Sequence, residues 1–236
     1  MSTRFTFYGH ATVGVELSDG RSLLIDPWVK DNPACPESFH AIDRVDAMLI
    51  THGHFDHIDD AVAVAKKYRP SVVVASLELS HWLEKQGVEN CIHGNLGGTL
   101  DVLGLKVTMT QAVHSSGVLD GDRFIHGGPA MGYAVRNPDG IDFYHAGDTA
   151  LFSDMQLIRE LYRPQLAFLP IGDIFTMDPL QAAKACRLLG VGRVVPIHWG
   201  TFPALTGTPE EFERQVKARE LNCEVITMQP GEVLEA

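Results

Sequence analysis

The strongest signal in this sequence is the segment Thr51-His52-Gly53-His54-Phe55-Asp56-His57. It follows the apolar run Ala47 to Ile50, which predicts a buried strand that stops at a polar loop. Apolar residues then recur at helical spacing from position 58 to 68, and Pro70 ends that pattern. The β-branched run Ser71 to Ser76 predicts the next strand. The segment is therefore the loop of a strand, loop, helix, strand unit.

The order of residue types in this loop is H-x-H-x-D-H, which indicates a metal site. Composition alone gives this pattern roughly 0.002 times in a chain of this length. Side chains two apart in extended backbone point the same way, so His52 and His54 face one position, while Asp56 and His57 can face a second. Imidazole and carboxylate suit Zn²⁺, Fe²⁺ or Mn²⁺, and two such ions roughly 3.5 to 4 Å apart can share a hydroxide.

Three further ligand candidates close later predicted strands. His114 follows the stretch Val107 to Val113, Asp148 comes shortly after the run Ile141 to Tyr144, and His198 directly follows Val194 to Ile197. A lone histidine or aspartate at a strand end is most often an ordinary structural residue. The H-x-H-x-D-H context raises all three to candidate metal ligands.

The remaining sequence pattern predicts an α/β (α+β) chain. In this pattern, a β-rich segment followed by strands that alternate with helices occurs twice. The predicted strands are 4–8, 12–17, 22–25, 47–50, 71–76, 105–109, 131–135, 141–144, 166–169, 194–197 and 224–227, and the later helices are 154–162, 179–189 and 209–221. Between them, Ser115 to Gly128 is rich in glycine and predicts a flexible loop. We expect one domain over residues 1–236, a four-layer αββα sandwich of two stacked sheets with helices outside.

With these motifs, the chain resembles the metallo-β-lactamase superfamily, whose fold is an αββα sandwich with a metal centre at one edge. The resemblance spans nearly the whole chain and is closest to metal-dependent hydrolases similar to the ascorbate phosphate lactonase and N-acylphosphatidylethanolamine phospholipase D branches. It rests on the metal loop and on four secondary motifs: Tyr8 to Ala11, Leu24 to Pro27, Phe175 to Met177 and Pro196 to Pro203. The resemblance implies that His52, His54 and His114 bind one metal, that Asp56, His57 and His198 bind the other, and that Asp148 bridges both.

The complete ligand set narrows the chemistry that the resemblance implies. Diiron flavoprotein oxygen reductases carry Glu where this chain has His54, zinc β-lactamases usually lack the bridging aspartate, and transfer-RNA processing nucleases carry an RNA-clamping arm. The expected reaction is hydrolysis of a small ester, lactone or phosphodiester by a water activated between two divalent ions, with zinc expected first and manganese or iron as alternatives. A nuclease-type phosphodiesterase and a non-catalytic metal-binding protein stay open as alternatives.

Further site residues follow with less support from motifs. The resemblance suggests that Asp56 also accepts a proton and that Asp26 supports the metal loop through hydrogen bonds. His145 either orients a ligand, donates a proton or is simply buried, and His10 either contacts substrate or is structural. In the glycine-rich stretch we expect Arg123 or His126 to meet an anionic part of the substrate, because Arg123 is the only cation between Lys106 and Arg136.

Composition limits the partners and the compartment. The formal charge of −11 disfavours nucleic acid, and the four cysteines lack C-x-x-C spacing and predict inert thiols. No apolar run reaches the roughly 20 residues of a membrane span, and the first residues lack the apolar stretch of a signal peptide. We therefore expect a cytoplasmic protein with a small-molecule substrate, and leave a homo-oligomer open.

Overall fold

The computed structural model describes residues 2–236 and contains two seven-stranded sheets. The first sheet begins as an antiparallel meander, β1–β2–β3, and continues through the parallel strands β4, β5 and β6, while β16 pairs with its outer edge at β1. Its strands are β1 (Arg4–Gly9), β2 (Thr12–Glu16), β3 (Ser22–Ile25), β4 (Ala47–Leu49), β5 (Val72–Ser76), β6 (Cys91–Gly94) and β16 (Val233–Glu235).

The second sheet repeats this plan, with antiparallel pairing in its first half and parallel pairing in its second. Its order is β15-β14-β13-β12-β11-β8-β7. The strands are β7 (Thr99–Val102), β8 (Leu105–Gln111), β11 (Met131–Arg136), β12 (Phe143–His145), β13 (Leu166–Pro170), β14 (Arg193–Ile197) and β15 (Glu224–Val225). Parallel strands send their carboxyl ends to one edge, so the loops after β4, β12 and β14 can meet there.

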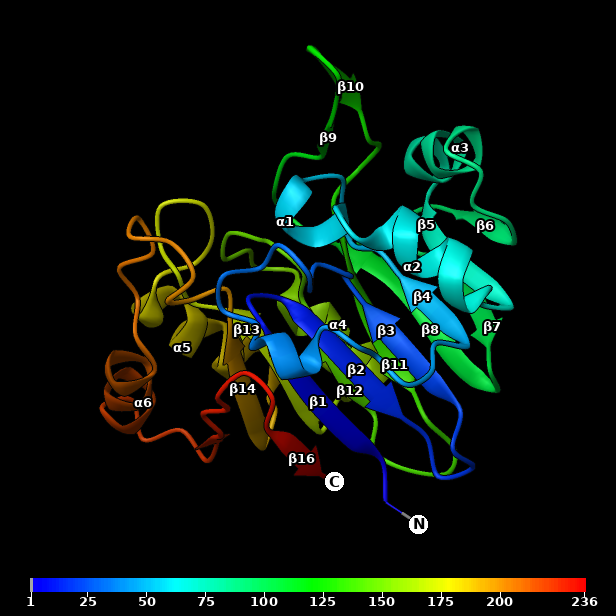
Figure 1. The fold of residues 1–236 in the computed structure, drawn as a ribbon. Coiled ribbons are helices and arrows are strands. Elements are labelled where there is room, and N and C mark those ends of the chain that lie inside the picture. The colour runs from blue at the N-terminus through cyan, green and yellow to red at the C-terminus, as the bar shows by residue number, and fades with distance from the viewer. Residues whose placement is uncertain (1) are drawn as a thin grey trace.

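The two sheets stack face to face and bury the main core between them (Figure 1). Phe5 of the first sheet packs edge-on against Phe143 of the second, with ring centroids 5.1 Å apart. A second cluster lies between the first sheet and helices α2 (Ala61–Tyr68) and α3 (Leu77–Lys85). A third lies between the second sheet and α4 (Met155–Tyr162), α5 (Pro179–Leu189) and α6 (Pro209–Lys217). The predicted αββα sandwich is confirmed.

Two helical details differ from the expectation. The helix predicted after the metal loop is divided into α1 (Phe55–Ile58) and α2, because the Asp60 N–H donates to Pro27 O at 3.1 Å instead of continuing the first helix. Helix α3 was not expected, since its apolar pattern is short. Its start is set by Ser76, whose hydroxyl accepts a hydrogen bond from Leu79 N at 3.2 Å.

The glycine-rich stretch is a hairpin and not the flexible loop that its composition predicted. β9 (Gly117–Asp120) pairs antiparallel with β10 (Arg123–His126), and the hairpin projects from the body of the molecule beside α1 (Figure 1). Its base is tied to the metal loop, because Gly53 N donates to Ser116 Oγ at 3.2 Å. A Cβ on Gly53 would lie 2.7 Å from the Val118 side chain, so only glycine fits at this contact.

No helix within residues 2–236 has both the length and the apolar character that a membrane crossing requires.

Candidate metal centre

The seven predicted ligands meet at one edge of the sandwich. The metal loop leaves β4 and enters α1, His114 follows β8, Asp148 follows β12 and His198 follows β14. Their ligand atoms form overlapping groups, each with all atoms within 4.8 Å of one another: His52 with His54 and His114; His52 with His57 and Asp148; and Asp56 with His57, His198 and His10. The structure thus brings together side chains separated by almost 150 positions in sequence.

Asp148 lies between the two sets. Its Oδ2 is 3.6 Å from His114 Nε2 and 3.9 Å from His52 Nε2 on one side, and 3.0 Å from His198 Nε2 on the other. Its Oδ1 is 3.4 Å from His57 Nε2. One buried carboxylate therefore faces histidines of both sets, which is the position that a bridging ligand must take.

A further observation indicates that these residues suit divalent ions: several of their buried polar atoms form no regular hydrogen bond within the protein. His57 Nε2, Asp148 Oδ1 and both ring nitrogens of His198 are buried and form no hydrogen bond of regular geometry, although His57 Nε2 and His198 Nε2 face the Asp148 carboxylate at 3.4 and 3.0 Å. Buried polar atoms are almost always paired, because leaving one unpaired costs about 1–3 kcal/mol. Four such atoms close together, all of ligand type, indicate that the site is built for positive ions.

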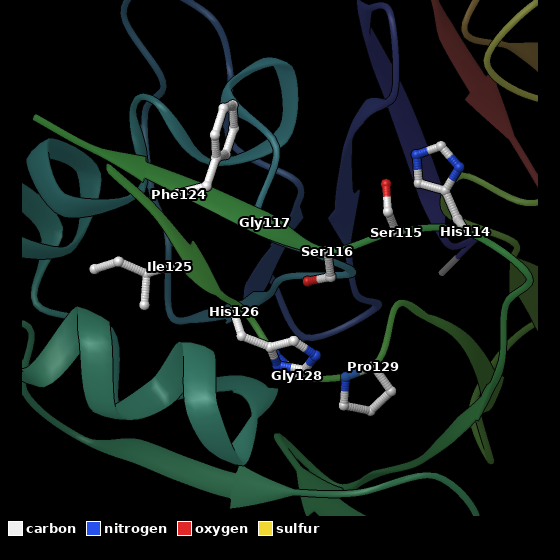
Figure 2. A pocket seen from close by; sticks show the side chains of 9 residues that line it. All are labelled: His114, Ser115, Ser116, Gly117, Phe124, Ile125, His126, Gly128 and Pro129. Atoms are coloured by element: carbon white, nitrogen blue, oxygen red, sulfur yellow. The ribbon is translucent and has the colours of Figure 1, made fainter. Parts of the chain in front are cut away.

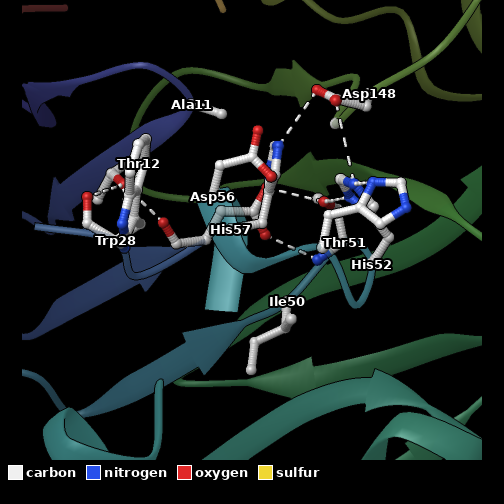
Figure 3. Close-up of polar contacts among 12 residues, drawn as sticks. Ala11, Thr12, Trp28, Ile50, Thr51, His52, Asp56, His57 and Asp148 are labelled. Carbon is white, nitrogen blue, oxygen red and sulfur yellow. Dashed lines mark hydrogen bonds and ion pairs between the residues drawn. The ribbon is translucent and has the colours of Figure 1, made fainter. Parts of the chain in front are cut away.

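Asp26 supports the metal loop through hydrogen bonds, as the resemblance suggested. Its Oδ1 accepts a hydrogen bond from Thr51 N at 2.8 Å, and its Oδ2 accepts from Thr51 Oγ1 at 2.7 Å. The same Oδ2 lies 2.8 Å from His57 Nδ1, so the ring donates there and turns Nε2 toward Asp148 (Figure 3). A carboxylate that fixes the tautomer of a metal-binding histidine in this way is a common feature of metal sites.

His10 supports Asp56 in the same manner. Its Nε2 is 3.0 Å from Asp56 Oδ2 and its Nδ1 is 2.9 Å from Thr201 Oγ1. The ring is 1 % exposed and does not line the pocket described below, which corrects the expectation of a substrate contact. We assign His10 to positioning Asp56, and note that it is near enough to the second set to count among its donors.

His145 is fully buried and satisfied by backbone groups. Its Nε2 lies 3.0 Å from Ala11 O, and its Nδ1 accepts from Gly147 N at 3.2 Å. Neither ring nitrogen is free to donate a proton to a substrate, so the geometry corrects that expectation and favours the alternative, in which His145 shapes the turn that presents Asp148.

Burial and neighbouring charges divide the histidines into two electrostatic classes. Burial lowers the pKa of His52, His54 and His114, so these rings are neutral at pH 7. For His57 and His198 burial acts in the same direction, but Asp148 and the other nearby carboxylates outweigh it. The pKa of His57 is held well above its usual value, and that of His198 is raised to about 9.

The backbone at the centre is strained where the strands end. His10, Asp26 and His198 have φ of 56°, 48° and 57°, a left-handed conformation that is uncommon outside glycine. His198 N also donates to His10 O at 2.6 Å, which joins the end of β14 to the end of β1. Strain of this kind persists where the surroundings fix it, and it is concentrated at functional sites.

A cavity of about 840 Å³ opens from the ligands to the surface. Five of the seven ligands line it: His54, Asp56, His114, Asp148 and His198. Its wall is mostly apolar, from side chains that the sequence did not single out as a group: Phe55, Leu119, Phe124, Ile174, Phe175 and Phe202. Phe55 lies inside the metal loop, and Phe175 and Phe202 lie within the secondary motifs, but no signal in the sequence marked these side chains as one apolar wall.

Neither of the polar hairpin residues predicted to contact substrate, Arg123 and His126, is among the residues that line this cavity. Arg123 is exposed, lies opposite Asp120 and is not among the residues that line the cavity, so this geometry gives no support to charge recognition by Arg123. His126 lines a neighbouring hollow of about 670 Å³ that shares His114 and Phe124 with the metal cavity (Figure 2). Its Nδ1 accepts from Gly128 N at 3.1 Å, so the His126 ring fixes the base of the hairpin.

Comparison with known proteins identifies the family at this point. Residues 21–199, which include the metal loop and the later ligands, match the model of the beta-lactamase superfamily domain. The chain is also 52% identical over 229 residues to a UPF0173 metal-dependent hydrolase of Koribacter versatilis, covering 97% of this chain and 96% of the relative. The chain belongs to this family of metal-dependent hydrolases. The expected superfamily is confirmed.

Solved structures agree with this placement. Igni18, a novel metallo hydrolase from Ignicoccus hospitalis, is 36% identical, covers 100% of this chain and 99% of its own, and has a TM-score of 0.87. CmlA, a diiron β-hydroxylase from Streptomyces venezuelae, is 17% identical with a TM-score of 0.76, and the match covers 100% of this chain and 54% of that one. The second likeness concerns the fold alone, since one fold carries several chemistries.

Proposed function

We propose that this hydrolase is dinuclear and that it cleaves a small ester, lactone or phosphodiester. One observation carries the proposal: Asp148 lies between two sets of imidazole and carboxylate ligands, within 4 Å of histidines in both. A single-metal site would not need ligands on both sides of one carboxylate. His52, His54 and His114 would hold one ion, Asp56, His57 and His198 would hold the other, and Asp148 would be a ligand available to either.

The donor set favours zinc, with manganese and iron as alternatives, because it contains neutral imidazoles and carboxylates and no thiolate. When bound, the ions would lower the pKa of water toward about 7 and polarise the oxygen of the scissile bond. The protein supplies the remaining steps. The Asp56 carboxylate would accept the proton of the attacking water, and His10 Nε2–H donates to Asp56 Oδ2 and holds this carboxylate in place.

The lining of the cavity supports a small substrate over a nucleic acid. It contains neither Lys nor Arg, and the chain carries a formal charge of −11. A phosphate backbone is held mainly by cationic side chains, so the nuclease alternative has no surface here that favours it.

Metal reconstitution tests the proposal. Protein stripped with a chelator and reloaded with Zn²⁺, Mn²⁺ or Fe²⁺ is assayed on p-nitrophenyl esters, lactones and bis(p-nitrophenyl) phosphate. We expect hydrolysis of at least one class, which disappears on stripping and in Asp148→Ala, while Arg123→Ala keeps the rate of the unaltered protein. Hydrolysis that survives complete removal of metal would refute the proposal.

A further inference from the structure

The most exposed apolar side chains of the molecule gather around the metal cavity. Large apolar residues at the surface are ordinarily scattered, and a contiguous patch of them marks a binding site. Within residues 2–236, six large apolar side chains are more than half exposed, and five of them line this cavity: Phe124 at 78%, Ile174 at 68%, Leu119 at 60%, Phe175 at 56% and Phe55 at 52%. The sixth, Leu161, lies on α4.

These side chains come from separate parts of the chain and converge. Phe55 begins α1, Leu119 and Phe124 belong to the hairpin, and Ile174 and Phe175 lie in the loop between β13 and α5. Phe202, after β14, completes the wall and stacks on the buried Trp28 at a centroid distance of 5.8 Å. The rim of the cavity is therefore apolar.

The exposure of Ile174 is fixed by the backbone. Asp173 and Ile174 have φ of 67° and 40°, and a left-handed conformation is an outlier for a β-branched residue such as Ile174. The turn is closed by Asp173 N, which donates to Met177 O at 3.0 Å, and by Thr206 Oγ1, which donates to Asp173 Oδ2 at 3.1 Å. An apolar side chain held toward solvent at a conformational cost indicates a partner that covers it.

The charges in the cavity specify what that partner is. Every ionisable side chain in the lining is one of the predicted metal ligands, and the one other polar side chain is Ser115. A carboxylate or phosphate on the substrate, away from the scissile bond, would find no cation along this wall. An uncharged apolar group would cover the exposed rings and lose no hydrogen bond.

We propose that this wall binds an apolar acyl or aryl group, so that the substrate is a neutral carboxylic ester or lactone carrying such a group. The inference rests on the proposed function and names its substrate class. The chemistry takes place at the ligands, and the wall selects the substrate by burying its chain.

A homologous series of esters tests the wall by activity. The specificity constant kcat/KM is measured for p-nitrophenyl acetate, butyrate, hexanoate and octanoate with the metal-loaded protein. Burial of a methylene changes a rate or affinity by up to about fourfold, so we expect kcat/KM to rise two- to fourfold for each methylene added. Phe124→Ala should flatten this dependence, whereas Arg123→Ala, its exposed neighbour outside the cavity, should keep it.

A second series separates binding from catalysis. Alkyl hydroxamic acids bind divalent metals through two oxygens, and their dissociation constants are measured by calorimetry from acetyl to octanoyl. We expect the dissociation constant to fall with each methylene, and to fall less steeply in Phe124→Ala at equal metal content.

The outcomes distinguish a failure of this inference from a failure of the proposed function. Chain-length dependence in hydroxamate binding, without hydrolysis of any ester, lactone or phosphodiester, supports the apolar wall and refutes the proposed function. Hydrolysis with no dependence on chain length, or of phosphodiesters alone, keeps the function and overturns the substrate class. A flat series in which Phe124→Ala shifts the sedimentation coefficient also overturns it, because the rim would then be an interface between copies.

Discussion

Metal binding to this centre should release protons, and the structure gives their number. In the metal-free protein at pH 7, His57 and His198 are protonated, because the carboxylates around them hold the pKa of both above its usual value. His52, His54 and His114 are already neutral, since their pKa values are lowered.

A ring nitrogen must lose its proton before it binds a metal, so loading the site displaces one proton from His57 and one from His198. The apparent affinity for metal therefore rises with pH up to about 9, by up to tenfold per pH unit for each proton released. The stability of the metal-free protein should change in the opposite sense. Its protonated rings offset the charge of Asp148, and this stabilisation is lost as pH rises through the same range.

Calorimetry of zinc binding at pH 7, in buffers that differ in ionisation enthalpy, counts the protons released. We expect about two from the histidines, with up to one more from bound water. The matched variant His198→Gln removes one titrating ring and should release one proton fewer than the unaltered protein. Equal proton counts for the two proteins would refute this account of the site.

The other predictions concern the ligands and their supports. Elemental analysis of saturated protein should give two metals per chain, with His93→Ala included to remove binding by the exposed group His81, Glu84 and His93; a saturated ratio of one would exclude the dinuclear centre. Asp148→Ala should lower kcat/KM at least 100-fold and loosen one metal or both, and full turnover in metal-replete variant protein would contradict the bridge. Asp26→Ala should lower the free energy of unfolding by about 1–3 kcal/mol, because it leaves buried hydrogen-bonding groups of Thr51 and His57 unpaired. Urea denaturation of this variant and of Asp26→Asn measures the loss. An unchanged midpoint would show that the loop does not depend on Asp26.

Candidate ligand positions could be proposed from the sequence because each depends on local sequence. His52, His54, Asp56 and His57 are close in the chain, and His114, Asp148 and His198 follow strands whose apolar runs are easily recognised. The edge of a parallel sheet gathers the residues that follow its strands, so their meeting point follows from topology.

The contacts that surround the ligands could not be predicted, because they depend on tertiary packing. The burial of His10 and His145 results from the stacking of two sheets and leaves no periodic signal. In the hairpin, the glycines suggested flexibility, and antiparallel pairing overrides that tendency. A contact with an anionic part of the substrate was predicted for Arg123, because it is the only cation of that stretch. Its neighbour Phe124 is the residue that lines the cavity.

The contact between Gly53 and the base of the hairpin separates sequence positions that can vary in evolution from positions that cannot. The loop that carries His52, His54, Asp56 and His57 lies so close to the hairpin that a Cβ at Gly53 would be 2.7 Å from the Val118 side chain, and Gly53 N donates to Ser116 Oγ at 3.2 Å. The far end of the hairpin, residues 119–124, includes no ligand, and Gly121 at its turn has open space around it. Insertions and substitutions at this end would reshape the wall and leave the ligand geometry intact. Members of one lineage could thus exchange substrates through a few residues at the hairpin tip while inheriting the same reaction.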